Sequence, residues 1–279
     1  MSPDRPWLRF YDPHVPASID TPRVTLPEAL ADTSRRCPDY PALIFKGRRI
    51  SYRDLNKSVD RMAAGLQALG VAKGDRVAIH LPNCPQFVIS YYAILRIGGI
   101  VVPCNPIYTA RELRHQLRDA GAGVIITLSL TYPTIRQIRP ETELGHVIVA
   151  QIKTYFPPIL KLLFTLALER RTGHAVDLAP DGSASWFTDF LRSAPTSPRP
   201  VDLHGEDTAV LMYTGGTTGV SKGAELTHKN ILVNAYQVLT WAGIQEARDA
   251  TLVALPLFHS YGMTCGMTPG ALVAATGIL

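Results

Sequence analysis

The chain is 279 residues long, and 46% of its residues are hydrophobic, 18% charged and 8% aromatic. This composition excludes an intrinsically disordered protein, which combines low hydrophobicity with many charges. The 28 basic and 23 acidic residues leave a net charge of +5, with no basic run long enough to indicate nucleic-acid binding.

The cysteines and the N-terminus bear on the cellular compartment. Cys37, Cys84, Cys104 and Cys265 lie far apart and form no CxxC pair, so we expect neither a disulfide scaffold nor a zinc site. The first residues lack the continuous apolar stretch of a secretory signal. No window reaches the roughly 18 consecutive apolar residues of a transmembrane helix. We therefore expect a globular protein of the reducing cytoplasm.

Strand-like and helix-like segments alternate along the first half of the chain. Helices are predicted after Ser51, from Pro85 and after Thr109, where Ser51 with Asp54 and Thr109 with Glu112 have capping-box spacing. The helix from Pro85 is apolar almost all round, which predicts burial. Short apolar strands are predicted at residues 42–45, 77–79, 100–103 and 124–127. This rhythm predicts an α/β fold of layered sheets with flanking helices and mainly parallel strands.

Residues 152–200 interrupt this rhythm. Within them, residues 156–171 form a short apolar helix whose only polar stripe is Lys161, Thr165 and Glu169, four residues apart. Basic residues flank it, so one interpretation is an interfacial helix that contacts a membrane or an apolar partner. The alternative is an ordinary core helix, which we favour because burial explains most apolar helices.

Residues 208–231 contain the chemically most informative segment. A strand from Ala209 to Tyr213 leads into a loop rich in threonine and glycine that precedes Lys222, and Thr227 then caps a helix over 228–242. Glycines let backbone amides approach an anion, hydroxyls donate to phosphate oxygens, and a lysine offsets negative charge. The spacing differs from G-x-x-x-x-G-K-[ST], because Val220 and Ser221 occupy the positions five residues after the paired glycines. A plain surface turn is the weaker alternative. The predicted phosphate-binding residues are Thr214, Gly215, Gly216, Thr217, Thr218, Gly219 and Lys222.

The segment YTGGTTGVSKG, residues 213–223, resembles the phosphate-loop signature YTSGTTGxPKG of the AMP-forming acyl-CoA synthetase and adenylate-forming superfamily. Gly215 stands where the signature has serine, as in long-chain fatty acid–CoA ligases, and Ser221 replaces proline. LTHKNI, LPLFHSYGM (residues 255–263) and residues 105–127 are also similar to that family. The resemblance covers about residues 24–279, and residues 1–23 form an N-terminal extension.

The resemblance implies a two-step reaction on a fatty acid. The carboxylate is first activated by ATP as an acyl-adenylate, and coenzyme A then displaces AMP. It implies Mg²⁺ as cofactor, with ligands that the sequence does not identify, and catalytic roles for Lys222 and Thr214. It also implies that His259, Tyr261 and Gly262 line the acyl pocket, although His259 by itself is more typical of a core histidine. His228 is predicted either to approach phosphate or to lie on the surface.

Later motifs of the family have no match, so the chain resembles the first half of such an enzyme. We expect a partial N-terminal AMP-binding domain over 24–279, without the C-terminal domain and inactive alone. A sheet ending at the strand-like residues 275–279 would expose an unpaired edge. The alternatives are another acyl-adenylating enzyme (an acyl–AMP ligase, or a medium-chain or aryl acid–CoA ligase) or a non-catalytic nucleotide- or lipid-binding domain. The expected location is the cytoplasm, and peripheral membrane contact through residues 156–171 is the alternative to the favoured core helix.

Overall fold

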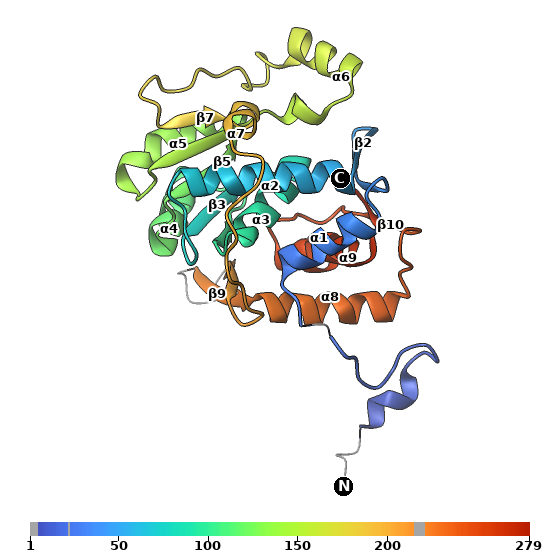
Figure 1. Cartoon of the computed structure of the whole chain (residues 1–279). Coiled ribbons are helices and arrows are strands. Elements are labelled where there is room, and N and C mark those ends of the chain that lie inside the picture. The colour runs from blue at the N-terminus through green and yellow to red at the C-terminus, as the bar shows by residue number, and fades with distance from the viewer. Residues whose placement is uncertain (1–4, 22, 215–220) are drawn as a thin grey trace.

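The computed structural model describes residues 5–21, 23–214 and 221–279. In these residues the strands build two sheets, and helices cover both faces of the larger one (Figure 1). The predicted α/β fold of layered sheets with flanking helices is therefore confirmed.

The larger sheet has the strand order β7-β6-β5-β3-β4-β8-β9. Its strands are parallel apart from β9, which runs antiparallel to β8. The strands are β3 (Arg76–His80), β4 (Ile100–Pro103), β5 (Val124–Leu128), β6 (His146–Ala150), β7 (Ala184–Trp186), β8 (Thr208–Thr214) and β9 (Lys222–Thr227). Because parallel strands point the same way, the carboxyl ends of β3, β4, β5 and β8 share one edge of the sheet.

The side chains of the central strands divide between two hydrophobic cores. Val77 and Ile79 of β3 pack in one cluster with residues of α2 (Tyr52–Ala68) and α3 (Pro85–Arg96). Ala78 points to the other face, where α4 (Ala110–Ala120) and α5 (Tyr132–Ile138) cover the sheet. This alternation is the two-residue period of a strand buried on both faces. Helix α3 is buried along almost its whole length, as its apolar sequence predicts.

The predicted helix starts are confirmed. The Ser51 hydroxyl accepts a hydrogen bond from the Asp54 amide at 3.1 Å at the start of α2. Thr109 and Glu112 form a reciprocal capping box at the start of α4. Thr227 caps α8 (His228–Ala242), which has the predicted bounds. These caps satisfy backbone amides that have no partner inside the helix.

The smaller sheet has the order β10-β11-β1-β2, with β10 (Ala250–Leu252), β11 (Thr276–Ile278), β1 (Pro41–Phe45) and β2 (Arg48–Ser51). Strand β11 pairs in parallel with β1 on one side and β10 on the other. The expectation of an unpaired edge at this strand is therefore wrong, because β11 lies between β1 and β10 and pairs with both. Helix α9 (Thr268–Val273) packs against α1 (Leu26–Arg36) and η6 (Gly262–Met267), and buried residues of all three share a hydrophobic cluster with β1.

The favoured interpretation of residues 156–171 as a core helix is wrong. They form α6 (Pro158–Leu163) and η5 (Phe164–Leu168), and these elements bury none of their residues. The segment lies beyond the edge strand β7 in Figure 1, where no second layer covers it. None of the helices in the described ranges is both long and apolar enough to cross a bilayer.

The remaining elements are η1 (Pro6–Phe10), η2 (Ser129–Thr131), η3 (Arg139–Glu141), η4 (Ile152–Tyr155) and α7 (Phe187–Ser193).

Candidate functional site

The two ends of the predicted phosphate loop are held by the β8–β9 pair. Thr214, the last residue of β8, is the register partner of Lys222, the first residue of β9. The Ser221 hydroxyl donates a hydrogen bond to the Thr214 carbonyl at 2.8 Å. The hydroxyl that replaces the usual proline thus ties one end of the loop to the other. The predicted residues Gly215, Gly216, Thr217, Thr218 and Gly219 lie outside the described residues.

Thr214 and Lys222 are both exposed at the carboxyl end of β8. Open α/β sheets bind their ligands at the carboxyl edge of the strands, so these side chains are placed where a phosphate ligand is expected. Lys222 can supply a positive charge there, and the Thr214 hydroxyl can donate a hydrogen bond to an oxyanion. The site is therefore chemically suited to an anion.

Tyr213 anchors the strand just before the loop. Its hydroxyl donates a hydrogen bond to the Asp119 carboxylate of α4 at 2.5 Å. Burial, followed by this hydrogen bond, raises the pKa of Tyr213, so the phenol remains a donor across the neutral range. A Cβ on Gly223 would lie 3.1 Å from Cε2 of the same ring, which explains the glycine on the facing strand. Sequence reasoning missed Asp119, because no local pattern connects residues 94 positions apart.

Asn83 fixes the segment that leads to the predicted acyl-pocket residues. Its side-chain amide donates to the carbonyls of Val253 and Leu255, both at 2.9 Å, and its carbonyl accepts from the Leu257 amide at 2.8 Å. Asn83 follows β3, so the segment that leads to His259 is attached to the same sheet edge as Thr214. The sequence gives Asn83 no role, and only the fold reveals one.

The predicted acyl-pocket residues differ in their surroundings. His259 and Tyr261 are exposed, whereas Gly262 is buried. A Cβ on Gly262 would lie 2.2 Å from the Pro256 carbonyl oxygen, so the backbone approaches closely at this position. A core position for His259 is excluded by its exposure. The assignment of the three residues to an acyl pocket stays a prediction.

His228 is neither a surface residue nor a free phosphate ligand. It is 1% exposed, and its Nδ1 accepts a hydrogen bond from the Leu26 amide at 3.4 Å. Burial lowers its pKa to about 4, which keeps the ring neutral at pH 7. The surface interpretation is therefore wrong. The residue instead joins the start of α8 to the start of α1.

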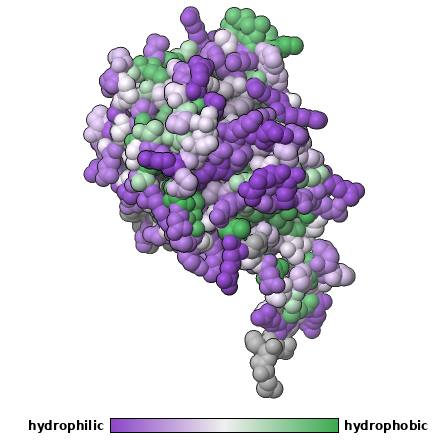
Figure 2. Space-filling model, viewed as in Figure 1, coloured by the Kyte–Doolittle hydropathy of each residue, from purple (hydrophilic) through white to green (hydrophobic). Residues whose placement is uncertain are grey.

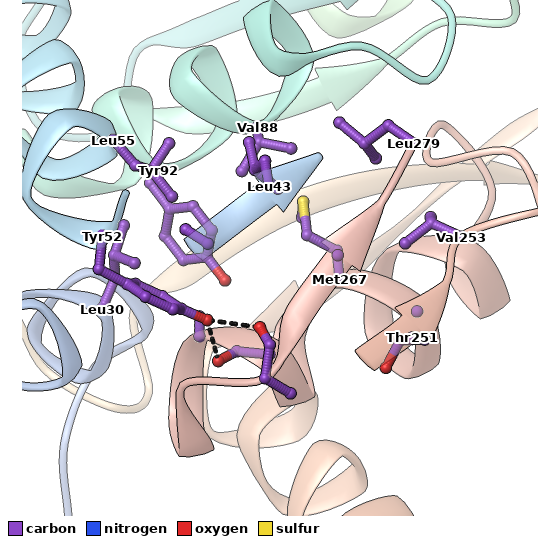
Figure 3. A pocket seen from close by; sticks show the side chains of 16 residues that line it. Leu30, Leu43, Tyr52, Leu55, Val88, Tyr92, Thr251, Val253, Met267 and Leu279 are labelled. Carbon is purple, nitrogen blue, oxygen red and sulfur yellow. Dashed lines mark hydrogen bonds between the residues drawn. The ribbon is translucent and has the colours of Figure 1, made fainter. Parts of the chain in front are cut away.

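A buried apolar pocket lies apart from these residues (Figure 3). The Tyr52 hydroxyl lies 2.6 Å from the Gly270 carbonyl oxygen and 2.7 Å from that of Ala275, and it donates to this pair. Leu43, Val88 and Met267 are among the apolar side chains that line the pocket. None of the described lining residues is a predicted site residue.

Mg²⁺ is the metal ion that the family resemblance implies. Across residues 5–21, 23–214 and 221–279, no group of three or more His, Cys, Asp or Glu side chains could hold a metal ion. Mg²⁺ often keeps water and binds through substrate phosphates with one or two protein oxygens. Thr214, with its hydroxyl beside the loop, fits such a role.

A family model described as "AMP-binding enzyme" matches residues 30–279, so the chain belongs to that family. The chain is 38% identical over 272 residues to a long-chain-fatty-acid–CoA ligase of Bacillus subtilis (strain 168), covering 96% of this chain and 48% of the relative. A long-chain-fatty-acid–CoA ligase of Salmonella typhimurium is 38% identical over 270 residues, covering 92% of this chain and 47% of the relative.

Solved structures show the same fold. A long-chain-fatty-acid–CoA ligase from Archaeoglobus fulgidus superposes with a TM-score of 0.77, at 23% identity, over 96% of this chain and 49% of that one. The chain therefore spans about half the length of the curated relatives and of this structure. Its likeness to adenylate-forming enzymes, expected from the phosphate-loop resemblance, is confirmed.

Proposed function

We propose that this chain is the nucleotide-binding part of an AMP-forming acid–thiol ligase that activates a long-chain fatty acid and transfers it to coenzyme A. The observation that carries the proposal is the pairing of Thr214 with Lys222 across the ends of the YTGGTTGVSKG segment. The names of the relatives support the choice of a fatty acid and coenzyme A.

The proposed first step forms an acyl-adenylate. A carboxylate oxygen of the fatty acid attacks the α-phosphorus of ATP, and the bond to the pyrophosphate oxygen breaks. Lys222 and Thr214 hold the β- and γ-phosphates, where negative charge accumulates on the leaving group. Mg²⁺, when bound with ATP, offsets further phosphate charge. Positioned charge is what this reaction requires from the protein, since phosphoryl chemistry needs little covalent participation.

In the proposed second step, the coenzyme A thiolate attacks the carbonyl carbon of the adenylate. The carbon–oxygen bond to AMP breaks, and a thioester forms. His259 and Tyr261 are proposed to border the acyl group, and the buried Gly262 to shape the wall behind them. Asn83 supports this arrangement by fixing residues 253–257 against the large sheet.

The test of this function is pyrophosphate exchange by the whole protein that contains the chain. Lys222→Ala removes a charge beside the leaving group and is expected to slow fatty-acid-dependent exchange about a hundredfold. Lys229→Ala is the matched control, because Lys229 is an exposed lysine of α8. Its Nζ lies 2.6 Å from Oε1 of Glu206. Equal exchange rates in the two variants would reject the role of Lys222.

A substrate panel tests the acid and the acceptor separately. Long-chain, medium-chain and aromatic acids are compared in the presence and absence of coenzyme A. We expect the long-chain acids to give the highest exchange rate and a thioester when coenzyme A is present. Adenylate without thioester would indicate an acyl–AMP ligase, and nucleotide binding without exchange would indicate a non-catalytic domain.

We also infer that the enzyme works in the cytoplasm and meets its amphiphilic substrate at a membrane surface. The separated cysteines support a reducing compartment. The exposed apolar side chains of residues 156–171 support peripheral membrane contact.

A further inference from the structure

An apolar ridge runs along α6 and η5, formed by Ile159, Leu162, Leu163, Leu166 and Leu168. Ile159 and Leu166 are each 77% exposed. The first four residues have the i, i+3, i+4, i+7 spacing of one helix face. Figure 2 shows hydrophobic surface gathered at the top of the molecule, over the position that α6 occupies in Figure 1. A contiguous exposed apolar face of this kind marks an interaction surface.

The segment is attached to the protein by its other side. Phe164 packs edge-to-face on Phe156, with ring centroids 5.5 Å apart, and contacts His174 at the same distance. Lys153 Nζ lies 2.5 Å from Glu169 Oε2, and both side chains are only 12% exposed. The segment therefore turns its carboxylate toward the body and its leucines outward. This orientation is the reverse of an ordinary surface helix, which buries its apolar face.

Positive charge borders the apolar ridge. Lys161, Arg170 and Arg171 are exposed on the same segment, and its acidic residue Glu169 is paired with Lys153. Arg48 of β2 donates to the Thr154 carbonyl at 3.3 Å, which adds a further guanidinium beside η4. A second copy of this chain would bring the same positive charges to the contact. An anionic lipid surface offers both the apolar layer and the opposite charge.

We propose that the apolar ridge inserts into the interface of an anionic bilayer while Lys161, Arg170 and Arg171 contact the lipid head groups. The Lys153–Glu169 pair orients the segment so that its leucines face the lipid. This inference deepens the proposed function, since it gives the membrane contact of a fatty-acid ligase a defined surface. Vesicle binding needs no catalysis, so a failure of this surface is distinguishable from a failure of the proposed reaction.

The test is co-sedimentation of the whole protein with vesicles of phosphatidylcholine, with and without phosphatidylglycerol. We expect stronger binding to the anionic vesicles and about tenfold weaker binding for Leu162→Gln/Leu166→Gln, which removes apolar area from the lipid contact. The matched control is Ile107→Gln/Leu252→Gln, because these residues are 86% and 72% exposed elsewhere on the surface. Equal losses in both double variants, or no binding by the unaltered protein, would overturn the proposal.

Two further measurements keep the proposal testable if a variant folds poorly. Arg170→Gln/Arg171→Gln should reduce binding to anionic vesicles only, whereas Arg136→Gln/Arg199→Gln, also at exposed positions, should not. Leu166→Trp should gain fluorescence that shifts to shorter wavelength with anionic vesicles and is quenched by brominated lipid. An unshifted spectrum overturns insertion. Self-association that Leu162→Gln/Leu166→Gln abolishes, without vesicle binding, would assign the surface to a second copy instead.

Discussion

The Tyr213 hydroxyl donates a hydrogen bond to the Asp119 carboxylate, across 94 positions of the sequence. Tyr213 belongs to β8 and Asp119 to α4, so the bond joins the strand before the phosphate loop to a helix on one face of the sheet. The position of Thr214, the next residue, therefore depends on a helix whose sequence carries no sign of this role.

Tyr213→Phe is expected to remove this bond while keeping the ring against Gly223. We expect an unfolding free energy about 0.5–1.5 kcal/mol lower, and slower pyrophosphate exchange if the loop is displaced. Because burial and Asp119 raise the pKa of Tyr213, its contribution to stability is complete below pH 10 and is lost only as pH rises further. Urea unfolding at neutral and alkaline pH checks both points. Asp119→Asn, which retains an acceptor, should be the milder change.

Gly262→Ala is expected to destabilise the fold by about 1–3 kcal/mol, because a Cβ there would overlap the Pro256 carbonyl oxygen. Gly123→Ala is the control, since no atom lies within 4 Å of its added Cβ. It should be neutral or slightly stabilising. Thermal unfolding of the two variants measures the difference. Equal melting temperatures would show that the 256–262 turn is free to relax.

Tyr52→Phe leaves the Gly270 and Ala275 carbonyls without the hydroxyl that lies between them (Figure 3). The expected loss is about 1–3 kcal/mol, the cost of unsatisfied buried groups. Tyr91→Phe is the matched control, because the buried Tyr91 hydroxyl has no hydrogen-bond partner within the described part of the chain. That variant should be unchanged or more stable. Chemical denaturation of both proteins separates a hydrogen-bond effect from a general effect of removing a buried hydroxyl.

The stability of the protein is expected to fall as pH falls from about 6.5 to 4. Burial lowers the pKa of His228, and that of His80, to about 4, so the unfolded chain binds more protons than the folded chain across this range. Each histidine can contribute on the order of 2–3 kcal/mol. His228→Gln should flatten part of this pH dependence, whereas His204→Gln, at an exposed position, should leave it intact. Denaturation midpoints of the unaltered protein and of both variants, measured at several pH values, test this prediction.

Much of the fold follows from local sequence. Capping boxes at Thr109 and Thr227 begin helices where they were predicted, and the runs at 77–79 and 124–127 are buried strands. The reason is that caps and apolar periodicity act between residues a few positions apart. The segment YTGGTTGVSKG likewise indicated the family from its own residue types.

Other features were decided by contacts between distant residues. The exposure of Leu166, the burial of His228 and the pairing of β11 on both sides each reversed an expectation. An apolar run predicts burial only if another layer covers it, and none of the described elements covers α6. The order of the strands and the partners of Tyr213 and Asn83 are set by how helices and sheets pack together. The sequence by itself therefore determined the elements and the family. The tertiary structure decided which distant side chains meet.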